Sequence, residues 1–552
     1  MINASRDRRP PPWRHFKQGE SIVNFRQSAL NWRRIAGIMA VAATAAFGAA
    51  STAAQAETVL RMAKTSIPRI LDPHFTTSFT ERDFGYLIYD TLFAVDHTFT
   101  VKPQMVESWT VSDDRLSYTF KLRDGLTFHN GAPVRSADCI ASIQRWAQRD
   151  GMGQKLAGLT KEWTAVDDRT FKLTLSRPYG FVLETLGKVG ASVPFIMPES
   201  VAKTPITETI KDYTGSGPFV FDQSAGTSGV KLVFRRFDKY VPRSEPADWA
   251  TGGKVAKVDK VEWIEFRDPM TAVNALTNRE IDFIHELPHD LAPLLESDRK
   301  VKVMVYNELG QLGFIRFNSL FPPFNDVNAR RAVLLAVNQK DFLQGLVGNE
   351  KYYSVCRSIY SCGSPYETDA GVPAVDLAKA KQALKASSYD GSPIVQFAAT
   401  NSATIGPLSE VLTRVLKDVG FNVKVEAMDF QTFTRKRLSQ SPPADGGWNI
   451  ALSTWTGPDV VDPVVNVSLG GAGLKAQWGW PSLPEIDALR DRFASTADPA
   501  ERKTIAAEIQ KLNYEQAIYI PTGTFKALAA YADNVKGIEP APALMLWGIS
   551  KN

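Results

Sequence analysis

The decisive stretch of this chain reads Glu107-Ser-Trp-Thr-Val-Ser-Asp-Asp-Arg-Leu-Ser-Tyr-Thr-Phe-Lys-Leu-Arg-Asp-Gly-Leu-Thr-Phe-His-Asn-Gly131. From Tyr118 to Arg123 apolar and polar residues alternate, which is typical of a strand with one buried face. The acidic pair Asp113-Asp114 precedes this strand and favours a turn. The stretch therefore predicts a β-hairpin.

A second hairpin is predicted about 50 residues further along the chain. Phe171 to Leu175 shows the same alternation, and it follows another acidic pair, Asp167-Asp168. Together the two hairpins predict a small antiparallel sheet domain between about residues 93 and 213.

The remainder of the chain predicts helices and parallel strands. Apolar residues recur at helical spacing from Ser136, a candidate N-cap, to Trp146. Further helices are expected at Thr271–Asn278, Val327–Asn338, Val375–Lys385, Pro407–Val419, Leu483–Ser495 and Pro499–Gln516. Strand-like runs at Ile394–Ala399 and Asn422–Ala427 alternate with these helices. This alternation predicts an α/β lobe with a largely parallel sheet.

The first 56 residues are typical of a signal peptide. Eight basic residues precede an uncharged stretch from Ile35 to Ala56, which ends in Ala54-Gln55-Ala56, a pattern that signal peptidase accepts. A retained membrane anchor is the competing interpretation. Arg33-Arg34 is a weak twin-arginine signal, so the choice between the Sec and twin-arginine routes stays open. We expect a periplasmic protein that begins at Glu57.

Removing this leader changes the charge of the protein. The leader holds 8 of the 64 basic and 2 of the 59 acidic residues, which leaves 56 basic and 57 acidic residues in the mature chain. The mature net charge of −1 argues against nucleic acid as a partner.

Cys356 and Cys362 are close enough in sequence for one local disulfide, and an oxidising compartment would permit it. Cys139, in a helical pattern, is expected to be a buried free thiol. No histidine lies near the cysteine pair, so a metal site is not expected there.

The sequence His285-Glu-Leu-Pro-His289 matches the zinc-protease pattern H-E-x-x-H. That chemistry needs both histidines on one helical turn, and Pro288 disrupts such a turn. We therefore expect a surface loop. Nucleophile elbows, P-loops and dinucleotide fingerprints are also missing, so we expect neither an enzyme nor a bound cofactor.

Several motifs follow one another in a recognisable order. They are Tyr89-Asp-Thr-Leu-Phe, the stretch quoted first, Gly215-Ser-Gly-Pro-Phe, Asn274-Ala-Leu-Thr-Asn-Arg-Glu-Ile-Asp-Phe, Phe317-Asn-Ser-Leu-Phe-Pro-Pro-Phe-Asn-Asp and Trp455-Thr-Gly-Pro-Asp-Val-Val-Asp-Pro. This order resembles that of the family 5 extracellular solute-binding proteins, the oligopeptide, dipeptide and nickel binders of ABC importers.

The resemblance implies a two-lobed α/β periplasmic binding protein fold with a hinge and an extra β-rich domain inserted in the first lobe. The first lobe would comprise residues 57–92, 214–308 and 518–552, the inserted domain 93–213 and the second lobe 309–517. Segments 306–317 and 518–525 would form the hinge. The implied function is capture of peptides or peptide-like compounds by a monomer, for delivery to an ABC transporter permease.

The segment from Trp448 to Trp480 is the strongest candidate for ligand contact, because it combines four tryptophans with several glycines. In related dipeptide binders an aspartate soon after Trp-x-Gly pairs with the α-ammonium group of the peptide. Asp459 is the nearest match, although Pro458 shifts the spacing and leaves Asp462 as an alternative. The predicted ligand-binding residues are Trp455, Thr456, Asp459, Trp478 and Trp480.

Two other functions stay open. One is a nickel or haem carrier of the same family, which would need converging imidazole or soft ligands. The other is an exported hydrolase. The sequence leaves the solute itself unnamed, because ligand choice depends on a few cleft side chains.

Overall fold

The computed structural model describes residues 57–76, 78–227 and 229–552. The predicted signal peptide, residues 1–56, lies outside the described residues. Within the described part of the chain, no helix combines the length and apolar character that a membrane span requires.

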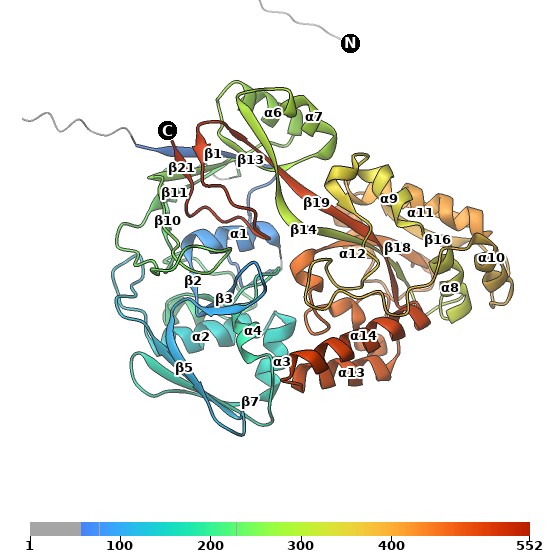
Figure 1. Cartoon of the computed structure of the whole chain (residues 1–552), viewed down its shortest axis with the longest axis horizontal. Coiled ribbons are helices and arrows are strands. Elements are labelled where there is room, and N and C mark those ends of the chain that lie inside the picture. The colour runs from blue at the N-terminus through green and yellow to red at the C-terminus, as the bar shows by residue number, and fades with distance from the viewer. Residues whose placement is uncertain (1–56, 77, 228) are drawn as a thin grey trace, which may run out of the picture. The chain divides into compact units, whose positions relative to one another are not determined.

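A mixed sheet of eleven strands connects the two halves of the described protein (Figure 1). Its order is β10-β11-β12-β1-β13-β19-β14-β18-β16-β17, with β15 (Tyr353–Ser354) paired to β19. The first half contains β1 (Val59–Lys64), β10 (Phe219–Phe221), β11 (Lys231–Arg236), β12 (Lys260–Glu265) and β13 (Phe283–Leu287). Helices α1 (Phe79–Ile88), α6 (Pro269–Thr277) and α7 (Ala292–Glu296) accompany these strands. We call this half the first lobe.

The second lobe is built around β16 (Ile394–Ala399), β17 (Val423–Met428) and β18 (Ile450–Thr456). Strand β16 runs parallel to both β17 and β18, which confirms the parallel arrangement predicted for residues 394–427. Its helices are α8 (Val327–Ala336), α9 (Gln339–Leu346), α10 (Leu377–Lys385), α11 (Ile405–Val419), α12 (Phe430–Lys436), α13 (Pro484–Ser495) and α14 (Pro499–Gln516).

Two long strands, β14 (Val301–Phe317) and β19 (Tyr519–Ala532), cross from one lobe to the other. Residues 301–305 of β14 pair with 528–532 of β19, and residues 311–316 pair with 519–525. The register shifts between these two parts. Gly310 adopts a left-handed conformation there, where an added Cβ would lie 2.1 Å from the carbonyl oxygen of Phe525. The ladder is therefore irregular between the lobes, inside the segment 306–317 that the sequence predicts as a hinge.

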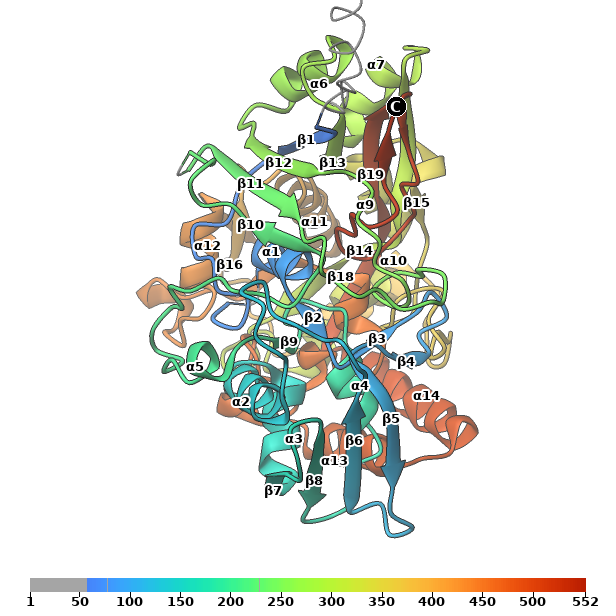
Figure 2. The same cartoon turned by 90° about the vertical axis from the view of Figure 1, so that its left-hand side faces the viewer.

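A separate antiparallel sheet lies beside the first lobe (Figure 2). Its order is β5-β6-β8-β7, formed by β5 (Val106–Val111), β6 (Ser117–Leu122), β7 (Thr160–Ala165) and β8 (Thr170–Leu175). Both predicted hairpins are confirmed. With α2 (Ser136–Trp146), α3 (Gly151–Leu159), α4 (Val182–Gly187) and α5 (Glu199–Ala202), this sheet forms what we call the extra domain.

The start of α2 differs by one residue from the prediction. The N-cap is Arg135, and Ser136 is the first helical residue. The carboxylate of Asp138 accepts a hydrogen bond from the Arg135 amide at 2.8 Å. This bond satisfies an N–H at the helix start, so no serine cap is needed.

Most of the apolar core forms two large clusters. One fills the first lobe and reaches α2 and α5 of the extra domain, and the other joins the extra domain to the second lobe. The contact between Phe181 and Phe493, whose ring centroids lie 5.3 Å apart, is part of that junction. The extra domain and the second lobe are thus closed onto each other in this structure. The lobe boundaries predicted from the sequence remain predictions.

Candidate functional site

A cavity of about 120 Å³ lies between the extra domain and the second lobe, and we call it the inner chamber. From the extra domain it is lined by Val95, Phe99, Met152, Phe181, Glu184, Lys188, Val189 and Gly190. From the second lobe it is lined by Pro365, Tyr366, Pro458, Val461, Asp462 and Val465. Both parts of the protein therefore contribute walls, and most of these walls are apolar.

The loop after β18 brings residues 457–465 to this chamber. Parallel strands place their carboxyl ends at one edge of a sheet, where ligands commonly bind in α/β proteins. A 3₁₀ turn, Gly457–Val460, follows β18 directly. At Gly457 an added Cβ would lie 2.4 Å from the Cβ of Leu309, so glycine is needed for the close approach of this loop to β14.

Asp459 connects the two sides of the cleft. One carboxylate oxygen accepts a hydrogen bond from the Ala191 amide at 3.0 Å, and the other accepts one from the Thr456 hydroxyl at 2.6 Å. The side chain is 8% exposed. Both oxygens are thus engaged by the protein itself, one of them across the interface.

Asp462 lies in the wall of the inner chamber. One of its oxygens accepts hydrogen bonds from the amides of Val464 (2.7 Å) and Val465 (3.0 Å). Burial raises the pKa of Asp462, although the two amides act in the opposite direction. Among the described residues no lysine or arginine forms an ion pair with this carboxylate. The nearby Arg502 pairs with Glu184 instead. Asp462 is therefore a buried acid to which a cationic ligand could bind.

The predicted tryptophans occupy different environments. Trp478 and Trp480 are each 4% exposed and belong to the core that Trp448 also enters. Trp455 is half-buried, stacks on Phe314 at 5.9 Å and donates from its indole nitrogen to the Ser468 hydroxyl at 2.9 Å. None of these indoles lines the inner chamber. The structure brings Thr456 and Asp459 together, but none of the five predicted ligand-binding residues lines the inner chamber.

Sequence reasoning missed Phe181, Glu184, Lys188 and Tyr366 as chamber residues. The first three flank or belong to α4, a short helix without a recognisable motif. Tyr366 follows Cys362 by four residues, so its position after the predicted disulfide loop was the one available signal.

A disulfide joins Cys356 to Cys362, whose Cα atoms are 6.0 Å apart. The segment that follows it supplies Pro365 and Tyr366 to the chamber. Cys139 is a buried free thiol, and burial raises its pKa.

We predict that the exported protein carries this bridge, which should contribute about 2–3 kcal/mol to stability for so short a loop. Unreduced protein, denatured and treated with an alkylating reagent, should gain one adduct, on Cys139. Three adducts per chain would contradict the bridge.

Arg502 of α14 contacts the extra domain at the edge of the inner chamber. Its guanidinium donates to the Gly180 carbonyl at 2.8 Å and to the Glu184 carboxylate at 3.1 Å. It also covers the ring of Phe181 at 4.0 Å. Arg502 is 8% exposed, so these contacts are largely shielded from water. They stabilise the closed arrangement without requiring Arg502 to contact a ligand.

Replacing Arg502 with alanine should weaken solute binding about tenfold, or by ~1–2 kcal/mol, because fewer molecules would be closed and competent to bind. Lys155→Ala is the matched control. The ion pair of Lys155 with Asp491 joins the same two parts at 2.8 Å, but this contact is open to solvent, so its loss should cost under ~1 kcal/mol. Titration calorimetry measures both affinities, and small-angle scattering of the unliganded protein should show a larger radius of gyration for Arg502→Ala. Equal affinities in the two variants would contradict this role.

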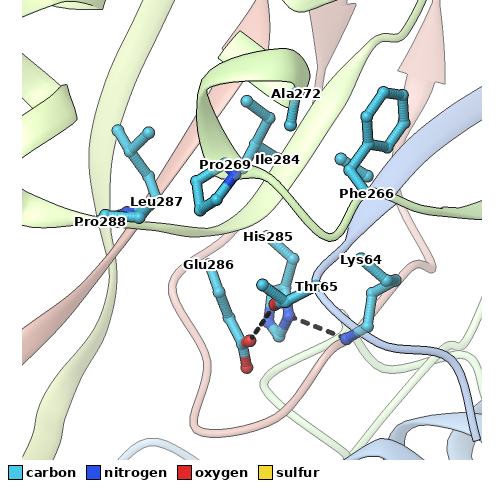
Figure 3. A pocket seen from close by; sticks show the side chains of 11 residues that line it. Lys64, Thr65, Phe266, Pro269, Ala272, Ile284, His285, Glu286, Leu287 and Pro288 are labelled. Atoms are coloured by element: carbon cyan, nitrogen blue, oxygen red, sulfur yellow. Dashed lines mark hydrogen bonds between the residues drawn. The ribbon is translucent and has the colours of Figure 1, made fainter. Parts of the chain in front are cut away.

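The H-E-x-x-H motif does not form a surface loop, as the sequence predicted, but part of strand β13 (Figure 3). His285 is 7% exposed, and its Nδ1 lies 3.3 Å from the Lys64 amino group. His289 begins a 3₁₀ turn, and its Nε2 is hydrogen-bonded to the Lys526 carbonyl oxygen at 2.9 Å. The motif was predicted as a surface loop because the neighbours that bury His285, Lys64 and Tyr306, are distant in sequence. In the described part of the chain, no three His, Cys, Asp or Glu residues are grouped to hold a metal ion.

A family model described as bacterial extracellular solute-binding proteins, family 5 middle, matches residues 100–473. The chain is 37% identical over 508 residues to the probable peptide ABC transporter periplasmic-binding protein y4tO of Sinorhizobium fredii, covering 91% of this chain and 95% of the relative. It is 25% identical to the glutathione-binding protein GsiB of Escherichia coli, covering 85% of this chain and 89% of that protein.

Solved structures of periplasmic binding proteins share the fold. AgaA of A. tumefaciens R10, solved with agropinic acid, has a TM-score of 0.74 and 21% identity, covering 90% of this chain and 99% of that chain. DppA of Helicobacter pylori, solved with the peptide STSA, has a TM-score of 0.73 and 21% identity, covering 90% and 98%. The predicted fold class, a two-lobed α/β binding protein with an extra β-rich domain, is confirmed.

Proposed function

Because the chain belongs to family 5 of the bacterial extracellular solute-binding proteins, we propose that it captures peptides or peptide-like compounds in the cleft between its lobes and delivers them to the permease of an ABC transporter. Its family and the similar solved structures are solute-binding proteins, which supports a binding role over catalysis.

The environment of Asp462 supports the proposed class of ligand. The inner chamber contains Asp462, a buried carboxylate without a cationic partner among the described residues, surrounded by mainly apolar side chains. Such a site favours a ligand with an ammonium group, because a charge-assisted contact is strong where water is excluded. Apolar neighbours suit the carbon skeleton of an amino acid. The names of the relatives y4tO and GsiB support the same ligand class.

Delivery would follow from closure of the lobes. A solute that contacts both sides of the cleft shifts the population toward the closed state by its higher affinity for that state. The register irregularity between residues 305 and 311 of β14 supports a hinge at this point. The closed monomer would then be the form that the permease recognises.

The test is to identify the solute. Protein purified without denaturation from its own periplasm should release a peptide or an amino-acid conjugate, detectable by mass spectrometry, and that compound should rebind to stripped protein in a calorimetric titration. Release of a compound without an amine, followed by rebinding of that compound, would contradict the proposed ligand class.

We also propose a periplasmic location, reached by means of the predicted leader. The expected result is a mature chain that begins at Glu57, because signal peptidase cuts after small-x-small patterns such as Ala54-Gln55-Ala56. N-terminal sequencing of the periplasmic fraction measures this. An N-terminus far from residue 57, or recovery of the protein only with membranes, would contradict it.

A further inference from the structure

A second and larger cavity adjoins the inner chamber, and we call it the outer chamber. Its volume is about 780 Å³. Its walls come from segments 97–99, 246–249, 307–309 and 537–548, together with Lys257 and Gly363. Phe99 lines both chambers, and the segment after the disulfide contributes Gly363 to the outer one and Pro365 and Tyr366 to the inner one. The two spaces are therefore neighbours that share Phe99 as a common wall.

The inner chamber is too small for most ligands, whereas the outer chamber has the size of a typical small-molecule site. Sites for small molecules usually measure about 300–1,000 Å³. The inner chamber, at about 120 Å³, is below this range, whereas the outer chamber lies within it. A compound whose ammonium group reaches Asp462 would fill the inner chamber with few atoms, and the rest of it would have to extend past Phe99.

Three aromatic side chains from distant segments line the outer chamber: Phe99, Trp249 and Trp547. The rings of Phe99 and Trp249 meet edge to face at 5.5 Å. The indole of Trp547 donates to the Trp249 carbonyl at 3.0 Å, and the Lys254 amino group lies 5.0 Å from the centre of the Trp547 ring. Aromatic walls of this kind favour a flat ring in the ligand.

Phe99 and Trp249 also share an unusual backbone conformation. Their φ angles are +61° and +50°, in the left-handed region that bulky residues rarely adopt. The loops that carry them are joined: the His97 amide donates to Asp248 at 3.0 Å, and its imidazole contacts the other oxygen of that carboxylate at 2.6 Å. Glycine would adopt both conformations without strain. Two aromatic residues that line the cavity occupy these positions instead, and such strain is often found at ligand sites.

From these observations we infer that the outer chamber is a second binding subsite, which takes a ring-bearing tail of the solute and stacks it against Trp249, Phe99 and Trp547. This inference rests on the proposed function in one respect, namely that the head of the same solute carries the ammonium group bound at Asp462. The preferred ligand is thus a short amino compound with a planar ring several bonds from its amine.

The first experiment uses two peptides as probes, Ala-Ala and Ala-Ala-Trp, with wild-type protein and the Trp249→Gly variant. Wild-type protein should bind Ala-Ala-Trp at least about tenfold more tightly than Ala-Ala, because only the longer peptide places a ring in the outer chamber. Trp249→Gly should lose this preference and leave affinity for Ala-Ala within about twofold. Glycine relieves the left-handed strain but removes the packing of the Trp249 ring, so a melting curve must accompany the titration and show that the variant is folded. Phe430→Ala, which removes an exposed aromatic ring elsewhere, is the matched control.

The second experiment separates this inference from the proposed function. N-acetyl-tryptophanamide has the ring but no amine, so it should bind weakly to wild-type protein and to Asp462→Asn, and fail to bind Trp249→Gly. If no peptide binds but this probe behaves as expected, the peptide function is wrong and the subsite stands. If Ala-Ala and Ala-Ala-Trp bind equally, or if Trp249→Gly binds Ala-Ala-Trp as well as wild-type protein does, the subsite is wrong and the peptide function stands.

Discussion

Replacing Asp462 with asparagine is expected to weaken binding of an amine-bearing solute by at least about thirtyfold, or ~2–5 kcal/mol. The carboxylate lies in the inner chamber wall, where burial raises its pKa and the described residues offer it no cationic partner. An ammonium group would supply that partner. Asparagine keeps an oxygen that can accept from the amides of Val464 and Val465, so the turn should persist while the charge is lost.

Asp459→Asn is the comparison that makes this test sharp. Asp459 is the residue that the sequence favoured, but its oxygens accept from the Ala191 amide and the Thr456 hydroxyl. Its replacement should affect closure more than ligand charge, and so should weaken charged and uncharged solutes alike. Titration of both variants with the identified solute and with its N-acetylated form distinguishes these effects. In the contrary outcome, Asp459→Asn loses affinity only for the amine-bearing solute while Asp462→Asn binds it normally. That result would show that Asp459 is the carboxylate that binds the ammonium group.

Much of the fold was predictable because local patterns agree with the final packing. The Asp113-Asp114 and Asp167-Asp168 turns lead into β6 and β8, whose alternate residues enter the core, so period and turn chemistry point to the same hairpins. In the second lobe, β16 is buried along its whole length, α11 buries one stripe, and β17 follows as a partly exposed strand. Their order predicts a parallel pair of strands, as the structure shows.

The candidate site was less predictable because it depends on residues far apart in sequence. Asp459 and Asp462 are three residues apart, and the amide that engages Asp459 across the cleft belongs to Ala191, some 270 residues away. Tryptophan side chains occur both in cavity walls and in cores. Trp478 and Trp480 pack in the core, against neighbours that a single sequence does not reveal. His285 was taken as exposed because its partners Lys64 and Tyr306 come from other strands.

Lowering the pH from 6.5 toward 4 is expected to destabilise the protein steeply. His74, His129 and His285 are buried, and burial lowers the pKa of each from 6.5 to about 4; in His285 the charge of Lys64 adds to this effect. Between these two pH values each histidine is neutral in the folded protein and protonated in the unfolded chain. Unfolding therefore takes up protons, and the free energy of unfolding should fall by ~1.4 kcal/mol per pH unit for each histidine. The stabilising contribution of these neutral histidines is fully present above pH 6.5 and is lost as the pH falls.

Urea unfolding at closely spaced pH values from 7 to 5 measures this slope. His285→Gln should reduce it by about one proton, or ~1.4 kcal/mol per pH unit, whatever its effect on stability at pH 7. His97→Gln is the control: His97 is exposed and Asp248 raises its pKa, so its contribution is present at low pH and disappears as the pH rises. Asp138 and Asp462, whose pKa values burial raises, also oppose the histidine effect. A flat wild-type profile between pH 6.5 and 5, or an unchanged slope in His285→Gln, would show that these histidines are not buried in their neutral form.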